Sequence, residues 1–215
     1  MTTKPPYHHG NLREALIDAA YGLARAGGPD AIVVREASRR VGVSHNAAYR
    51  HFPDRESLLE RVGERALAEL AARMQRLIDR TDPDDRSLPA ARARLRATGR
   101  AYVEFAIAEP GLFRTAFRAA GEHLGEGGSL PPGPFQLLSG VLDGLDRAGG
   151  IAPGARPYAE FAAWSGVHGF STLVLDGPLG AIPAPEREAA LDQLFTTIES
   201  GLAGRPPARG SPRAP

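Results

Sequence analysis

The chain has 215 residues, 42% of them hydrophobic, with a net charge of +1 and no cysteine. That length is enough to bury a substantial core, and the lack of cysteine excludes disulfide bonds and thiolate metal sites. No apolar run approaches the roughly 20 residues of a membrane span, and the N-terminal stretch lacks the apolar centre of a signal peptide, so we expect a cytoplasmic protein.

Charge is distributed unevenly along the chain. Residues 1–55 carry a net charge of +3, residues 204–215 carry another +3, and residues 56–203 between them carry −5. A basic end on an acidic body predicts a polyanionic partner that binds at one end only.

The spacing of apolar residues is helical along nearly the whole chain. A first helix is predicted from Asn11, whose side chain can cap it, to the glycines at 27 and 28. The segment "VREASRRV" predicts a short second helix that ends at Gly42. Ser44 can then cap a third helix that runs to about His51.

A long fourth helix is predicted after Pro53-Asp54, and it lasts until the "TDPDD" segment. Further helical segments are predicted at about 88–108, 110–119, 134–148, 156–175 and 186–203. Because no alternating strand pattern of convincing length appears, we predict an all-α protein of about nine helices.

The polar stretch "SHNAAYRH" at 44–51 could hold a metal, perform chemistry or form a binding surface. His45 and His51 are six positions apart, about 240° around a helix, so they point to different sides and make a poor zinc pair. The sequence lacks the common nucleophile and zinc-protease motifs, and its one lysine, Lys4, cannot form a phosphate-binding loop. We therefore predict no metal site, no cofactor and no enzyme.

The remaining interpretation is a helix-turn-helix. The two short helices are joined by a Gly-Val-Ser turn, and the small Ser38 lies four residues before Gly42, which lets the helices cross closely. The second of them presents polar side chains at its N-terminal end, the end that meets base edges in a major groove. Positive charge for phosphates surrounds it in Arg35, Arg39, Arg40, Arg50 and Arg55.

These residues resemble a known family. The segment "GNLREALIDAAYGLARAGGPDAIVVREASRRVGVSHNAAYRHFPDRESLL" resembles the N-terminal domain of the tetracycline-repressor (TetR) family of bacterial regulators. "WSGVHGFSTLVLDG" at 164–177 looks like the tryptophan–histidine–glycine signature of the C-terminal domain in one branch of that family. The resemblance implies a homodimeric, ligand-responsive transcriptional regulator, most often a repressor, that binds a palindromic operator.

By position, the resemblance places DNA contacts on the helix-turn-helix and at the start of the fourth helix. The expected DNA-binding residues are Arg35, Ser44, His45, Asn46, Ala47, Tyr49, Arg50, His51 and Arg55. Of these, Tyr49, His51 and Arg55 are expected to hold phosphates. Three positions depart from the family pattern: Val33 replaces a capping threonine, Asn46 replaces a small glycine and could pair with adenine, and Ala48 lacks the bulk commonly found at its position.

Apolar and aromatic residues in the rest of the chain could line a ligand pocket or fill a core, and their spacing alone does not distinguish the two. The family resemblance implies that the last two helices form a dimer interface. The candidate ligand-binding residues are Tyr102, Phe105, Phe113, Phe117, Trp164 and His168. The pair Trp164 and His168, one helical turn apart, suits packing as well as ligand contact. The expected dimer interface, a stripe on the last two helices, consists of Phe161, Leu191, Leu194, Phe195, Ile198 and Leu202.

Three regions are expected from these patterns. Residues 1–54 form a helix-turn-helix domain with an arm at 1–9, residues 55–203 form a helical regulatory and dimerisation domain, and residues 204–215 form a disordered tail. The expected partners are double-stranded DNA, a small-molecule effector and a second copy of the chain. The alternative is a helical small-molecule-binding or catalytic protein whose basic N-terminal region is incidental.

Overall fold

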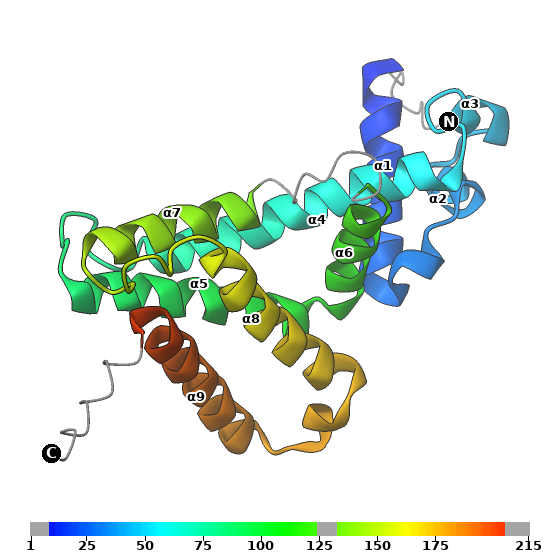
Figure 1. The fold of residues 1–215 in the computed structure, drawn as a ribbon. Coiled ribbons are helices and arrows are strands. Elements are labelled where there is room, and N and C mark those ends of the chain that lie inside the picture. The colour runs from blue at the N-terminus through cyan, green and yellow to red at the C-terminus, as the bar shows by residue number, and fades with distance from the viewer. Residues whose placement is uncertain (1–8, 124–132, 205–215) are drawn as a thin grey trace, which may run out of the picture. The chain divides into compact units, whose positions relative to one another are not determined.

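The computed structural model describes residues 9–123 and 133–204. Within these residues the chain forms helices, two short 3₁₀ turns and no strand, which confirms the predicted all-α fold (Figure 1). The helices are α1 (His9–Gly27), α2 (Val34–Val41), α3 (His45–Tyr49), α4 (Arg55–Ile78), α5 (Leu88–Ala108), α6 (Pro110–His123), α7 (Pro134–Arg147), α8 (Ala159–Asp176) and α9 (Ala184–Ala203). Apart from His9 and Gly204, the predicted arm and tail lie outside the described residues.

The helix boundaries differ from the prediction at a few places. Helix α1 begins at His9, so Asn11 lies inside its first turn and is not its cap. Helix α8 begins at Ala159 rather than at 156, because Tyr158 adopts a left-handed conformation (φ 67°) that a helix cannot contain. The 3₁₀ turns η1 (Pro29–Ala31) and η2 (Pro178–Ala181) each begin with a proline and were not predicted.

The chain divides into two compact units that do not follow chain order. The first unit consists of residues 1–70 and 108–133, and the second of residues 71–107 and 134–215. Helix α6 belongs to the first unit and packs against α1 and η1, whereas α5 before it and α7 after it belong to the second unit.

The first unit is built on the apolar face of α1. Leu16 and Ala20 of this helix are fully buried, as are Ala37 of α2 and Phe52 after α3. Helix α6 crosses α1 so closely that a Cβ on Gly111 would lie 2.2 Å from the backbone oxygen of Ala24. Only glycine permits this approach.

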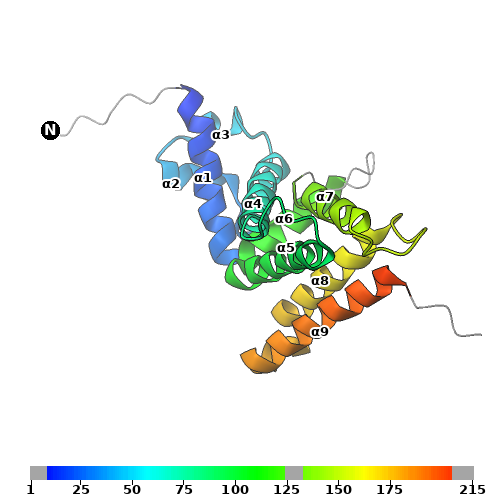
Figure 2. The ribbon, with the colours of Figure 1, turned by 90° about the vertical axis from the view of Figure 1, so that its left-hand side faces the viewer.

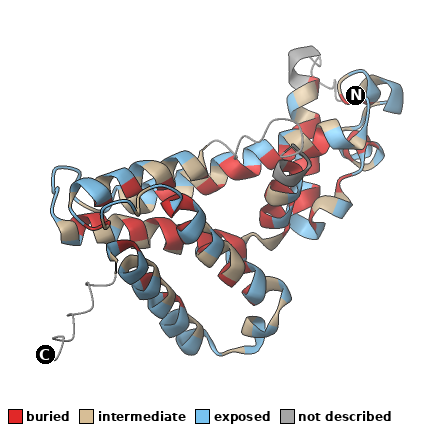
Figure 3. Ribbon diagram, in the orientation of Figure 1, coloured by how far each residue is buried: buried red, intermediate tan, exposed pale blue. Residues whose placement is uncertain are grey.

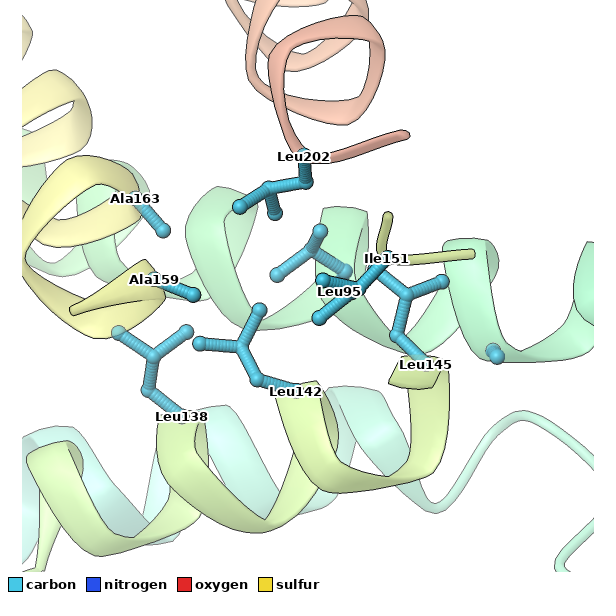
Figure 4. Close-up of a cluster of buried hydrophobic side chains, with 9 residues drawn as sticks. Leu95, Leu138, Leu142, Leu145, Ile151, Ala159, Ala163 and Leu202 are labelled. Atoms are coloured by element: carbon cyan, nitrogen blue, oxygen red, sulfur yellow. The ribbon is translucent and has the colours of Figure 1, made fainter. Parts of the chain in front are cut away.

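The second unit has its own core between α5, α7, α8 and α9 (Figure 4). The buried members of this cluster are Ala91, Leu95, Leu138, Leu142, Leu145, Ile151, Ala159, Ala163 and Leu202. Helix α9 is also tied to α5 by charge, since Arg96 donates to both carboxylate oxygens of Glu199 at 2.7 and 3.0 Å. At Gly99 of α5 an added Cβ would lie 2.6 Å from the ring of Phe195, so this helix contact is also close.

Helices α8 and α9 lie side by side and present an outer face that is largely exposed (Figures 2 and 3). On α8 the exposed positions include Phe161 and Leu173, 47% and 46% exposed, with Ser165 between them. On α9 the exposed Ala190, Gln193, Thr197 and Gly201 are small or uncharged, whereas Glu186, Glu188 and Asp192 are exposed and charged.

Candidate nucleic-acid interface and ligand site

The turn between α2 and α3 has the geometry that the sequence predicted. Gly42 adopts the left-handed conformation (φ 76°) that ends α2. The backbone N–H groups of Gly42 and Val43 both donate to the carbonyl oxygen of Ser38, at 3.0 and 3.1 Å. Ser38 is fully buried, as a residue at a close helix crossing should be.

Helix α3 is short and is held by its cap and by two buried residues. The hydroxyl of Ser44 accepts from the backbone N–H of Ala47 at 3.3 Å, which confirms Ser44 as the N-cap. Ala48 and Phe52 are buried and attach the helix to the rest of the first unit. Its polar side chains are left on the outside.

Most of the predicted DNA-contact residues of this helix lie on that outer surface. His45, Asn46 and Arg50 are exposed, Tyr49 is 43% exposed, and Ala47 and His51 are half-buried. Tyr49 is thus available for contact and is not part of the core. The structure therefore groups the exposed polar residues on one short helix, next to the capping Ser44.

The position before α2 lacks a capping side chain. Val33 stands there, makes no side-chain cap hydrogen bond and is 44% exposed. A valine can donate nothing to a phosphate, so the contact that a threonine would offer at this position is lost.

The arginines of α2 differ in how they are paired. The guanidinium of Arg39 donates to both carboxylate oxygens of Glu36 at 2.9 and 2.8 Å, and Arg40 donates to the same carboxylate at 3.3 Å. The hydrogen bond from Arg39 is the main cause that lowers the pKa of Glu36 to about 2. Arg35 at the start of α2 and Arg50 at the end of α3 are both exposed.

Arg55 occupies a structural position that the sequence did not reveal. Its guanidinium donates to the backbone oxygens of Ile32 at 3.0 Å and Pro29 at 2.7 Å, and also to the carboxylate of Glu56 at 2.8 Å. The side chain is only 29% exposed. A phosphate would have to compete with these three partners, all within the first unit.

In the second unit, three of the candidate ligand residues form a hydrogen-bonded group. The indole N–H of Trp164 donates to the hydroxyl oxygen of Tyr102 at 3.0 Å, and that oxygen lies 2.8 Å from Nδ1 of His168. Burial raises the pKa of Tyr102 and lowers the pKa of His168, which favours the neutral form of each side chain. Phe105 is fully buried on the same helix as Tyr102.

The other two candidate ligand residues belong to the first unit. Phe113 and Phe117 lie on α6, and their ring centroids are 4.8 Å apart. The structure thus brings four of the six residues together in one unit and pairs the remaining two in the other. The helical spacing of the aromatic residues could not reveal this division, because it depends on how α6 packs.

A groove in the second unit was not foreseen from the sequence. It has a volume of about 490 Å³ and is bounded by the end of α4, the following turn, the start of α5 and one face of α7. Apolar residues such as Ile78, Leu137 and Val141 line it together with the arginines at 86, 94 and 147. None of the six candidate ligand residues contributes to it.

The expected dimer residues also divide into two groups. Leu191, Phe195 and Leu202 are buried in the chain's own core, so their side chains cannot form the surface that meets a second subunit. Leu194 and Ile198 are half-buried and lie beside Gly166 of α8. Phe161 is the member of the set that remains exposed. An amphipathic stripe predicts an apolar partner, and α5 and α8 of the same chain cover much of the stripe on α9.

The capped α3, the close α2–α3 crossing at Ser38 and the left-handed Gly42 define a helix-turn-helix protein. Comparison with family models agrees, because residues 16–62 match the bacterial regulatory proteins of the tetR family. Residues 95–198 match the tetracyclin repressor-like C-terminal domain. The chain belongs to the TetR family, and it is a DNA-binding transcriptional regulator.

Solved structures share the fold over nearly the whole chain. A protein of unknown function from Rhodococcus sp. RHA1 is 30% identical, with a TM-score of 0.72 over 94% of this chain and 100% of that one. A TetR-family regulator from Pectobacterium atrosepticum is 22% identical, with a TM-score of 0.61 over 92% of this chain and 97% of that one. A TetR variant from Acinetobacter baumannii AYE, solved with minocycline, is 19% identical, with a TM-score of 0.59 over 93% and 98%.

No curated protein matches the chain. Among the described residues, no helix has the length and apolar character needed to cross a membrane.

Proposed function

We propose that the chain is a homodimeric repressor that binds a palindromic operator and releases it when a small-molecule effector binds. The observation that carries the proposal is α3, a short capped helix whose buried side holds Ala48 and whose outer side exposes His45, Asn46, Tyr49 and Arg50. Such a helix suits insertion into a major groove.

The exposed residues of this surface have separable roles. His45 and Asn46 at the start of α3 read base edges, while Arg50, Tyr49 and Arg35 contact phosphates and fix the register. Ser44, Ala47 and His51 border the same surface. Arg55 acts differently from the other arginines, because its guanidinium holds the η1 turn and the following Ile32 at the start of α4.

Dimerisation is assigned to the outer faces of α8 and α9. Phe161 and Leu173 are large, apolar and exposed, and the uncharged residues on α9 allow close approach of a second pair of helices. A palindromic operator requires two copies of α3, one for each of two successive major grooves about 34 Å apart, and a dimer with two-fold symmetry supplies the second copy.

The effector is assigned to the second unit. Two places there suit a small molecule: the polar group formed by the buried Tyr102 with the half-buried Trp164 and His168, and the groove bordered by α7. The dimer is proposed to exchange between a state whose two α3 helices fit the operator and a state whose α3 helices have the wrong spacing. An effector that binds the second state more tightly lowers operator affinity, by an amount set by the ratio of its affinities for the two states.

Binding to the DNA upstream of its own gene tests the first part of the proposal. A regulator binds such DNA with a steep salt dependence and a sequence preference over a scrambled fragment of equal length. Salt-independent binding, or equal affinity for both fragments, would instead favour a helical protein whose basic end is incidental.

A pair of variants distinguishes the two effector positions. An added Cβ at Gly144 meets no atom within 4 Å and the residue lines the groove, so Gly144→Phe fills the groove without disturbing the core. His168→Ala removes one member of the polar group. Effector-induced DNA release and thermal melting are measured on the same samples. Loss of release in only one variant, with melting unchanged, locates the effector, and normal release in both variants would contradict both positions.

A further inference from the structure

Ser38 of α2 makes a side-chain contact with His45, the first residue of α3. The hydroxyl oxygen of Ser38 lies 2.9 Å from Nδ1 of His45, and it lies 2.8 Å from the backbone carbonyl oxygen of Arg35. Ser38 is fully buried, whereas His45 is exposed. One side of the imidazole is therefore held against α2, and the other side faces outward.

The direction of these two hydrogen bonds follows from counting protons. A carbonyl oxygen can only accept, and two oxygens at 2.8 Å without a proton between them would repel each other, so the single hydroxyl proton of Ser38 lies toward Arg35. The hydroxyl can then only accept from His45. Nδ1 of His45 must carry a proton, and in a neutral imidazole Nε2 is left with a lone pair.

We propose that Ser38 is a positioning residue that fixes the Nδ1-protonated tautomer of His45, so that Nε2 selects a base with an amine in the major groove. Adenine offers its N6 amine there and cytosine its N4 amine, whereas guanine and thymine present acceptors to that edge, apart from the thymine methyl group. A bare Nε2 therefore accepts from the adenine or the cytosine of the base pair that His45 meets, and not from its thymine or guanine. The inference rests on the proposed DNA contact of His45.

The tautomer can be measured without DNA. Nitrogen-15 NMR of the full chain at pH 8, where imidazoles are neutral, separates protonated from bare ring nitrogens, and the His45→Asn variant assigns the signals. The expected spectrum has a protonated Nδ1 and a bare Nε2 for His45. In Ser38→Ala the same residue should show exchange between tautomers. A protonated Nε2 in the wild type would overturn the proposal.

Ser57→Ala is a matched control for Ser38→Ala. The hydroxyl of Ser57 also donates to the carbonyl of the residue three positions earlier, at 3.0 Å, but it makes no contact with His45. The control should leave the His45 spectrum unchanged. A change of equal size in both variants would show that the ring responds to loss of any hydroxyl that is bonded three residues back, and not to loss of its own acceptor.

The choice of base is tested with operator fragments. Selection from a random library with wild type and His45→Ala locates the base pair that depends on His45. The adenine or cytosine of that pair is then replaced by an analogue that lacks only the exocyclic amine. Wild-type affinity should fall about 2- to 10-fold, as expected for one neutral hydrogen bond, and Ser38→Ala, whose ring exchanges between tautomers, should distinguish the two fragments less than the wild type does. Equal wild-type affinities for the two fragments would refute the inference. If the chain binds no DNA while the tautomer is as expected, the proposed function fails instead, and the base preference with it.

Discussion

The guanidinium of Arg55, the first residue of α4, donates to the backbone oxygen of Pro29 at 2.7 Å, across 26 positions of sequence. Together with its bond to Ile32, this contact joins the start of α4 to the η1 turn that precedes α2. An arginine in the place where the family resemblance expects a phosphate contact thus serves to hold the helix-turn-helix together.

Replacing Arg55 should therefore affect stability more than DNA binding. In Arg55→Ala two backbone carbonyls lose their charged donor, and we expect a loss of about 1–2 kcal/mol in the free energy of unfolding. Arg50→Ala should leave stability unchanged but reduce the log–log salt slope of DNA binding by about one unit. Urea unfolding and fluorescence anisotropy measure the two effects. A lower salt slope with unchanged unfolding in Arg55→Ala would return this residue to the phosphate contacts.

The close approach of α6 to α1 predicts a strong effect of one methyl group. In Gly111→Ala the new Cβ would lie 2.2 Å from the oxygen of Ala24 and 2.7 Å from that of Arg25, so the helices must separate. We expect a destabilisation of about 1–3 kcal/mol or more. Gly140→Ala in α7 is the control, since its Cβ meets nothing within 4 Å and should stabilise the helix by about 0.5–1 kcal/mol. Equal melting temperatures in the two variants would contradict the close contact.

The hydrogen bonds among Tyr102, Trp164 and His168 predict that removal of the Tyr102 hydroxyl lowers the free energy of unfolding. Tyr102→Phe removes the oxygen that accepts from Trp164 and contacts His168, in a residue that is nearly fully buried. Loss of a partner at a buried polar group costs about 1–3 kcal/mol, which should appear as a lower midpoint of urea unfolding with an unchanged slope. A stability within error of the wild type would show that these side chains do not depend on the hydroxyl.

Burial of His168 makes stability depend on pH. Desolvation lowers its pKa below the ordinary 6.5, so the unfolded chain takes up a proton at a higher pH than the folded chain does. Between the two values the unfolded state binds more protons, and stability falls as pH decreases. The contribution is fully present above the unfolded value and is lost as pH falls toward the folded one. His168→Gln should flatten the melting temperature between about pH 5 and 7; a parallel pH profile in the two proteins would count against this assignment.

The outer face of α8 predicts the oligomeric state of two charge variants. Phe161→Glu and Leu173→Glu each place a carboxylate on the proposed interface, and they should shift the sedimentation profile from dimer to monomer. Val33→Glu is the control, because Val33 is exposed to a similar extent, 44%, but lies in the first unit. Dimers of unchanged stability in both α8 variants would exclude this face.

Local signals in the sequence were enough to predict the helix-turn-helix. Gly42, Ser44 and the buried Phe52 act within a few residues of their partners, and each has the role that its neighbours in sequence suggested. The partner of Arg55 could not be predicted in this way. Its acceptors are backbone carbonyls in a turn, and no residue type marks a carbonyl that needs a donor.

The apolar stripe of α9 shows a second limit. The spacing of Leu191, Phe195 and Leu202 correctly predicted a buried face, and all three are buried. Hydrophobic periodicity reports that a face must be covered but not by which chain, because α5 and a second subunit offer the same chemistry. The tautomer of His45 likewise depends on Ser38, whose small size signalled only a helix crossing.

The glycine contact between α1 and α6 constrains how such a regulator can be recombined. The family's C-terminal match begins at residue 95 and so includes α6, yet α6 is packed into the unit that holds α3. In a chimaera that joins residues 1–70 of this chain to the C-terminal part of a relative, the relative's helix would have to pack against Ala24 in place of α6. We therefore expect such chimaeras to fold mainly when the relative's helix also has a glycine at the position of Gly111. A graft confined to α2 and α3 avoids this requirement.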